Sequence, residues 1–157
     1  MTSTPCPNPV SKNKFFRMSK APFVVAFSAV YMVSGTAGAD MIADRKVNFK
    51  ANAAAMKAIA AAISAGDRST VSQKAQSIAS WARKIPTYFP EGSDSGDTKA
   101  KPEIWFEFDD FNNRAQANQK AALALVKAAE TGDPAAMIAG LKNLGASCKA
   151  CHSSYKD

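Results

Sequence analysis

The sequence predicts an all-α protein, an antiparallel four-helix bundle with one long crossover loop between its second and third helices. Between Asp40 and Asp157, apolar residues recur at helical steps of three and four in four separate stretches, and no stretch alternates with the period of two typical of strands. Turn-forming residues separate these stretches, and all but one of the separators are short, as in an antiparallel bundle. The 157 residues are enough for one domain.

The first two helices are defined by their apolar stripes and by the residues that end them. We expect the first helix from Asp40 to Ala65, before a glycine. The second is expected to begin near Ser69, a residue type that caps helix N-termini, and to be closed by Pro86. The first stripe consists of Met41, Arg45, Phe49, Asn52, Met56, Ile59 and Ile63, and the second of Val71, Ala75, Ile78, Ala82 and Ile85.

Residues 87–101 have no periodicity and are rich in Gly, Ser and Asp, so they are expected to form the crossover loop. The third helix is expected to follow Pro102 and to end near Thr131. The fourth is expected to open with Asp133 as N-cap and Pro134 at the first helical position. The third stripe consists of Trp105, Phe108, Phe111, Ala115, Ala122, Val126 and Ala129, and the fourth of Met137, Leu141, Leu144, Cys148, Cys151 with His152, and Tyr155.

Residues 1–39 are expected to be a signal peptide. They contain four basic residues and no acidic one, then an apolar run over residues 21–33, then an A-x-A segment ending at Ala39. The apolar run is shorter than the roughly 20 residues that a membrane-spanning helix needs. We expect cleavage after Ala39, a periplasmic mature domain of residues 40–157 and no membrane attachment after cleavage. An N-terminal membrane anchor is the alternative, and Met18 is hypothesised to be the true start.

The formal charge of the chain is +7. The four basic residues of the expected signal peptide contribute to it, and without them 16 Lys and Arg stand against 13 Asp and Glu, or +3. This modest excess does not favour nucleic-acid binding, so no nucleic-acid partner is expected.

Cys148, Cys151 and His152 form the motif that carries chemistry. His152 is the only histidine in the chain, and the third cysteine, Cys6, lies in the expected signal peptide. Two thiols three residues apart on a helix can both add to vinyl groups on one edge of a porphyrin, and the next residue brings its imidazole under the iron. We therefore predict one covalent haem c, with thioethers at Cys148 and Cys151 and His152 as axial iron ligand.

Two other uses of the motif, a zinc site and a redox-active pair, are less favoured. A zinc site would need a fourth ligand from a carboxylate or water. A thioredoxin-like redox pair would need an α/β fold.

The second axial ligand is left open by the residues alone. With one histidine, it must be methionine, lysine or nothing. Met137 lies fifteen residues before His152 on the same expected helix, about 22 Å away, and cannot reach round the haem. Met41 and Met56 remain as candidates.

Several segments resemble the cytochrome c′ family, the class II cytochromes c. Residues 145–156 resemble its C-terminal haem motif, and Arg45-x-x-x-Phe49 with residues 53–58 resembles its haem-covering segment. Residues 89–92 and 101–105 are also similar, so the resemblance covers nearly all of the chain from Asp40 onward.

The resemblance implies that Phe49 stands over the distal face of the haem, where low-spin members such as cytochrome c-556 have a ligating methionine. Phenylalanine cannot ligate. Met56 lies seven residues from Phe49, about 10.5 Å along a helix, so both cannot cover the iron, and in this register Met56 packs in the core. A six-coordinate, cytochrome c-556-like electron carrier with a methionine ligand is the alternative.

An open iron position under an apolar ring favours small neutral diatomics and offers no donor to bound dioxygen. We expect binding of NO and CO with one-electron cycling of the iron, and no enzymatic turnover. The resemblance implies NO binding, protection against nitrosative stress or electron transfer to a periplasmic partner that the sequence does not identify. A peroxidase-like enzyme is disfavoured because the chain has no second histidine.

By resemblance, Arg45 and Lys46 lie near the haem edge, where Arg45 could pair with a propionate. Thr98 is a further candidate for this edge, and Lys156 is expected beside His152. Family members are often homodimers through their first two helices, and the alanine-rich first helix would permit the close approach of a second copy.

Overall fold

The computed structural model describes residues 36–157, with side chains from Asp40 onward. These residues form one compact unit. The expected signal peptide lies almost wholly outside the described residues, as does the alternative start at Met18.

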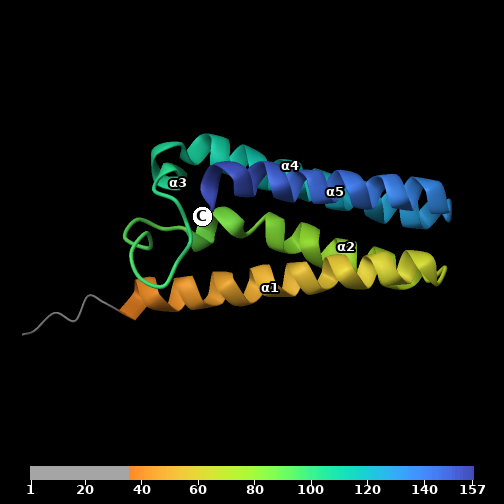
Figure 1. Ribbon diagram of the computed structural model, residues 1–157, viewed down its shortest axis with the longest axis horizontal. Coiled ribbons are helices and arrows are strands. Elements are labelled where there is room, and N and C mark those ends of the chain that lie inside the picture. The colour runs from red at the N-terminus through yellow and green to blue at the C-terminus, as the bar shows by residue number, and fades with distance from the viewer. Residues whose placement is uncertain (1–35) are drawn as a thin grey trace, which may run out of the picture. The chain divides into compact units, whose positions relative to one another are not determined.

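The prediction of an all-α four-helix bundle is confirmed (Figure 1). α1 and α2 run side by side, as do α4 and α5, and the long crossover loop lies at the same end as the C-terminus of α5. No helix among the described residues is both long enough and apolar enough to cross a bilayer. The elements are α1 Thr36–Ser64, α2 Arg68–Ala82, the 3₁₀ turn η1 Ile85–Tyr88, the single turn α3 Glu103–Phe106, α4 Phe108–Thr131 and α5 Pro134–Tyr155.

Helix starts follow from capping residues. Asp133 caps α5 as predicted, because its carboxylate accepts a hydrogen bond from the backbone N–H of Ala135 at 2.9 Å. The prediction of Ser69 as the cap of α2 is wrong. Asp67 takes that place and accepts from the N–H of Thr70 at 3.0 Å, because Gly66 at φ 73° turns the chain one step earlier.

The second predicted helix ends earlier than expected. α2 stops at Ala82, and Pro86 occupies the 3₁₀ turn η1, where a residue without an N–H at the second position costs no helical hydrogen bond. Ile85 is buried as predicted, but from η1.

The third predicted helix is interrupted. Glu107, at φ −120° and ψ 41°, separates α3 from α4. This break changes the helical phase, so Ile104 is buried while Phe106 is 85% exposed. The predicted burial of Phe108 is wrong for the same reason, and its side chain is exposed.

The core has two clusters at opposite ends of the helices. The aliphatic cluster lies toward the α1–α2 and α4–α5 connections and includes Ile59, Val71, Ile78, Leu125, Met137 and Leu144 among several alanines. The aromatic cluster lies toward the crossover loop and includes Trp81, Ile85, Phe89, Ile104, Phe111 and Tyr155. Several large side chains of the aromatic cluster line a cavity between α1 and α5.

Candidate haem-binding site

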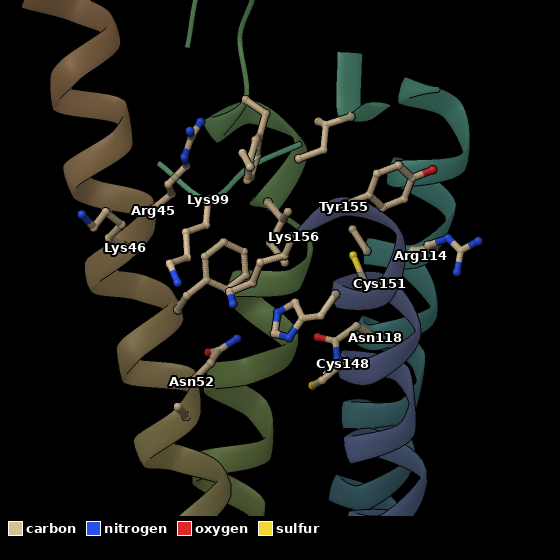
Figure 2. A pocket seen from close by; sticks show the side chains of 18 of the residues that line it. Arg45, Lys46, Asn52, Lys99, Arg114, Asn118, Cys148, Cys151, Tyr155 and Lys156 are labelled. Atoms are coloured by element: carbon tan, nitrogen blue, oxygen red, sulfur yellow. Dashed lines mark hydrogen bonds between the residues drawn. The ribbon is translucent and has the colours of Figure 1, made fainter. Parts of the chain in front are cut away.

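A cavity of about 750 Å³ lies between α1 and α5, closed at one end by the crossover loop (Figure 2). Its size falls within the range of cofactor sites, roughly 300–1,000 Å³. All the residues predicted for the haem site line this one cavity, although they come from three separate segments of the chain: Arg45, Lys46, Phe49, Thr98, Cys148, Cys151, His152 and Lys156.

The Cys-x-x-Cys-His motif occupies the last two turns of α5. Both cysteines are free and half-buried. Burial raises the pKa of Cys151 to about 11 and also raises the pKa of Cys148, so both groups are neutral thiols at neutral pH. The amide of Asn118 on α4 donates to Cys148 Sγ at 3.3 Å and to Ser147 Oγ at 2.9 Å, and thereby holds this turn against α4.

The His152 imidazole opens on the cavity. Desolvation of the ring there, and the charge of Lys156, both lower the pKa of His152. A lowered pKa favours the neutral imidazole, which is the form that ligates metals.

Phe49 faces His152 across the cavity. The two ring centroids lie 6.3 Å apart at an interplanar angle of 70°. Behind it, the Phe49 ring makes an edge-to-face contact with the buried Trp81, with centroids 5.6 Å apart. Trp81 in turn packs on Tyr88 at 4.7 Å. This chain of rings determines where Phe49 lies.

Neither candidate methionine takes the position of Phe49 opposite His152. Met56 also lines the cavity, but its side chain lies beside Gly145 on α5. Met56 Cε is 3.8 Å from the position that a Cβ on this glycine would occupy. Gly145 precedes His152 by seven residues, or about 10.5 Å of helix. Met41 is not among the lining residues of the cavity.

Arg45 is almost fully buried, with 2% of its surface exposed, and its guanidinium is committed to the crossover loop. Nη1 donates to Tyr88 O and to Ser93 Oγ, and Nη2 donates to Ser93 O at 2.8 Å and to Thr98 Oγ1 at 2.7 Å. The Arg45 Cζ also lies 4.4 Å from the centre of the Phe89 ring. Burial lowers the pKa of Arg45, but its ordinary value is so high that the group stays charged. The pairing with a propionate stays a prediction.

Ser93 was missed by the sequence prediction. Its side chain is fully buried, and its hydroxyl donates to Pro90 O at 2.8 Å while accepting from Arg45. Nothing in a loop rich in Ser, Gly and Asp distinguishes it, because its partner lies 48 residues away.

The residues present fit a covalently bound haem. The donor set is two thiols three residues apart and one imidazole beside them, on the wall of a cavity whose opposite wall carries an aromatic ring. Lysines at the rim, Lys46, Lys50, Lys99 and Lys156, offer cations for two carboxylates. Among the described residues, no group of three His, Cys, Asp or Glu side chains is close enough to hold a metal ion by itself.

Comparison with known proteins agrees with this chemistry. Residues 40–156 match the sequence profile of the cytochrome c′ family. The chain belongs to the cytochrome c′ family. Cytochromes c′ carry covalently attached haem c and are periplasmic proteins, so the prediction of haem c as cofactor is confirmed at the level of the family.

Individual relatives include both branches of this family. A cytochrome c′ from Rhodospirillum rubrum is 47% identical over 83 residues, which are 52% of this chain and 56% of that protein. A cytochrome c-556 from Agrobacterium tumefaciens is 39% identical over 100 residues, 61% of this chain and 80% of that protein. The structure of a nitric oxide complex of a cytochrome c prime mutant from Alcaligenes xylosoxidans superposes with a TM-score of 0.68 at 25% identity, covering 76% of this chain and 96% of that chain.

A polar network supports the haem-motif end of α5 in this member of the cytochrome c′ family. The Tyr155 hydroxyl donates to Asp110 Oδ2 at 2.6 Å. Arg114 binds the same carboxylate through Nε and donates to Ala150 O through Nη1 at 3.0 Å. The sequence prediction placed Tyr155 on the buried stripe but missed Asp110 and Arg114, whose i, i+4 spacing is also common on ordinary helix surfaces.

Proposed function

We propose that this chain holds one haem c through thioethers at Cys148 and Cys151, with His152 as the axial ligand and an open distal face under Phe49. On this face it binds NO and CO, and the iron cycles by single electrons. The observation that carries the proposal is the Phe49 ring lying opposite His152, whereas Met56 lines the cavity level with Gly145 and Met41 does not line it.

The haem, when bound, supplies the iron that takes the gas and the electron. The chain supplies the surroundings. Phe49, supported by Trp81, restricts the distal space and excludes bulky ligands. Arg45 and Thr98 hold the crossover loop as one wall, and Lys46 is paired with Asp97 at its rim. Lys156 lies close enough to His152 to influence its pKa, so we assign it a role in access to the proximal side.

An absorption spectrum of the purified ferric holoprotein at neutral pH tests the proposal. A high-spin spectrum is expected, with rapid formation of a nitrosyl complex when NO is added to the ferrous protein. A low-spin ferric spectrum would contradict the open distal face. Phe49→Met is the gain-of-ligand control, because it puts a thioether where the ring now faces His152, and it should convert the spectrum to low spin.

A low-spin electron carrier is the second candidate, because Met56 also lines the cavity and because the relatives include a cytochrome c-556. It predicts a sulfur-to-iron charge-transfer band that disappears in Met56→Ala. Under the open-site proposal, Met56→Ala leaves the spectrum unchanged. Met41→Ala, outside the cavity lining, is the matched control for methionine loss.

We also propose that the mature protein is a periplasmic homodimer joined through α1. The outward face of this helix is apolar along several turns, with Val47 66% exposed and exposed alanines at 43, 51, 54 and 61. Val47→Glu is expected to convert dimer to monomer in sedimentation analysis. Intact mass of the exported protein tests the cleavage after Ala39.

A further inference from the structure

Asn52 places an uncommitted amide in the cavity. It follows Phe49 by three residues on α1, so both side chains lie on the same face of the helix, one turn apart. Asn52 is half-buried and lines the cavity, and Figure 2 shows its amide directed into the cavity, toward α5. Within the described residues no hydrogen bond engages it, whereas the other cavity asparagine, Asn118, is committed to Ser147 and Cys148.

The charges around this amide are strongly one-sided. Among the residues that the structure describes, Asp97 is the only acidic one that lines the cavity, and Lys46 already pairs with it. Lys50, Lys57, Lys99 and Lys156 line the same cavity and make no ion pair within the described part of the chain. Figure 2 shows the side chains of Lys99 and Lys156 reaching into the space that the Asn52 amide faces.

The crossover loop and the end of α5 hold two of these lysines in place. Lys99 O accepts from the N–H of Asp157 at 3.0 Å, and the N–H of Lys101 donates to Tyr155 O at 3.1 Å. Ala100 and Lys156 form an antiparallel bridge between these hydrogen bonds. These hydrogen bonds fix the backbone of Lys99 and Lys156 beside the cavity. Lys156 Nζ donates to Asp157 O at 3.2 Å, and the other three cavity lysines without an ion pair have no side-chain hydrogen bond within the described residues. Two propionates would neutralise two of these four lysines and leave the potential at the mouth positive.

A hydrogen-bond donor and a positive potential favour a ligand that carries negative charge. A neutral diatomic such as CO gains little from either, whereas an anion gains from both, and low local dielectric strengthens these interactions. We propose that the distal side of this chain binds small inorganic anions of the azide class, with the Asn52 amide donating to the ligand and the rim lysines attracting it. The inference rests on the open distal face proposed above.

Titration of the ferric holoprotein with sodium azide, followed by absorption at fixed ionic strength, tests the inference. Asn52→Ala is expected to weaken azide binding about tenfold or more, the effect of losing one hydrogen bond to a charged group. The variant is expected to fold, since Asn52 lies between Ala51 and Ala53 in an alanine-rich helix and alanine has the highest helix propensity. Asn52→Gln, which keeps the donor, should restore most of the affinity.

Asn48→Ala is the matched control, because Asn48 lies one turn earlier on α1, outside the cavity lining, with its amide bonded to Asp44 O. It should leave azide binding unchanged. Lys99→Gln should weaken azide binding about two- to fivefold at low salt and less at high salt, since screening reduces the contribution of an exposed charge.

Binding of CO to the ferrous protein separates this inference from the proposed function. CO affinity in Asn52→Ala should stay within about twofold of wild type, because CO carries little charge for the amide to stabilise. If wild type binds CO but not azide, or if Asn52→Ala binds azide as tightly as wild type, the anion inference is overturned and the open distal face stands. If neither CO nor azide binds, the proposed function itself is overturned, and this inference with it.

Discussion

The two ends of the bundle differ in how their interiors are filled. Toward the short connections, alanine and aliphatic side chains such as Ile59, Leu125 and Leu144 close the space between the helices. Toward the crossover loop, aromatic rings frame a cavity of about 750 Å³ that the chain leaves open. The first end needs only helix packing, whereas the second is completed by its prosthetic group. The same four helices thus pack directly against one another at one end and surround the haem cavity at the other.

The largest effect is expected from removing the covalent attachment of the haem, which completes the aromatic end. Cys148→Ala together with Cys151→Ala should abolish covalent haem attachment, because both thioether positions are lost. Haem staining after denaturing electrophoresis measures this. Amide exchange should then accelerate in residues 89–101 and in the last turn of α5 but not in α2 residues 71–79. Equal acceleration at both ends would show that the two ends are not independent.

The next largest effect is expected from a substitution that changes the aliphatic end alone. Leu125→Ala should lower the free energy of unfolding by about 3 kcal/mol, because Leu125 is completely buried and its truncation leaves a cavity. Leu123→Ala is the matched control on the same helix, where the side chain is 37% exposed, and it should cost less than about 1 kcal/mol. Urea denaturation of the holoprotein measures both. The haem spectrum of Leu125→Ala should stay that of wild type.

Arg45→Met tests how the crossover loop is held at the aromatic end of the bundle. It should lower the free energy of unfolding by about 2 kcal/mol, because it leaves the buried Ser93 without its donor. Lys46→Met, which removes an exposed ion pair from the adjacent position, should lower the free energy of unfolding much less, because exposed ion pairs contribute little to stability. If the two variants unfold at the same urea concentration, Arg45 does not act as the tie of the crossover loop.

The smallest expected effect is a pH dependence at the aromatic end. Hydrogen bonds from Tyr155 and Arg114 lower the pKa of Asp110, so the carboxylate is favoured in the folded state. Its stabilisation is present above the unfolded pKa of about 3.9 and is lost as pH falls through the lower folded pKa. Tyr155→Phe should therefore flatten the loss of stability as the pH falls below about 5. Asp109→Asn, at the exposed neighbouring position, should not reproduce this flattening.

A feature of the structure could be predicted from the sequence when the residues that cause it are close together in the chain. The cap at Asp133 and the burial of Met137, Leu144 and Tyr155 on α5 depend on the local helical pattern, and they were predicted correctly. His152, predicted on the same stripe, is exposed to the cavity. The break at Glu107 was not predicted, because it depends on Trp105 donating its indole N–H to Pro90 O, fifteen residues away, and on Ile104 entering the aromatic cluster.

The site shows the same distinction. Two thiols and an imidazole at fixed spacing were visible in the sequence because one helix carries all three. Thr98 was placed near Arg45 by family resemblance, but the contacts of Arg45 with Tyr88 and Ser93 were not visible. These residues lie 43 and 48 positions away, and sequence spacing contains no information on such contacts. Phe49 was placed by family resemblance, and Asn52 gained a role only from the cavity it faces.

The hydrogen bonds from Arg45 to the crossover loop also affect the order in which parts of the protein fold. α4 and α5 meet across a connection of two residues, as α1 and α2 do across three, so these pairs can form from neighbouring chain at little loop-closure cost. The contact between Arg45 and Ser93 spans 48 residues and requires both α1 and the crossover loop to be in place. The wall of the cavity is therefore expected to close last and to reopen first, which leaves the way to the cysteines accessible while the rest of the bundle is already folded.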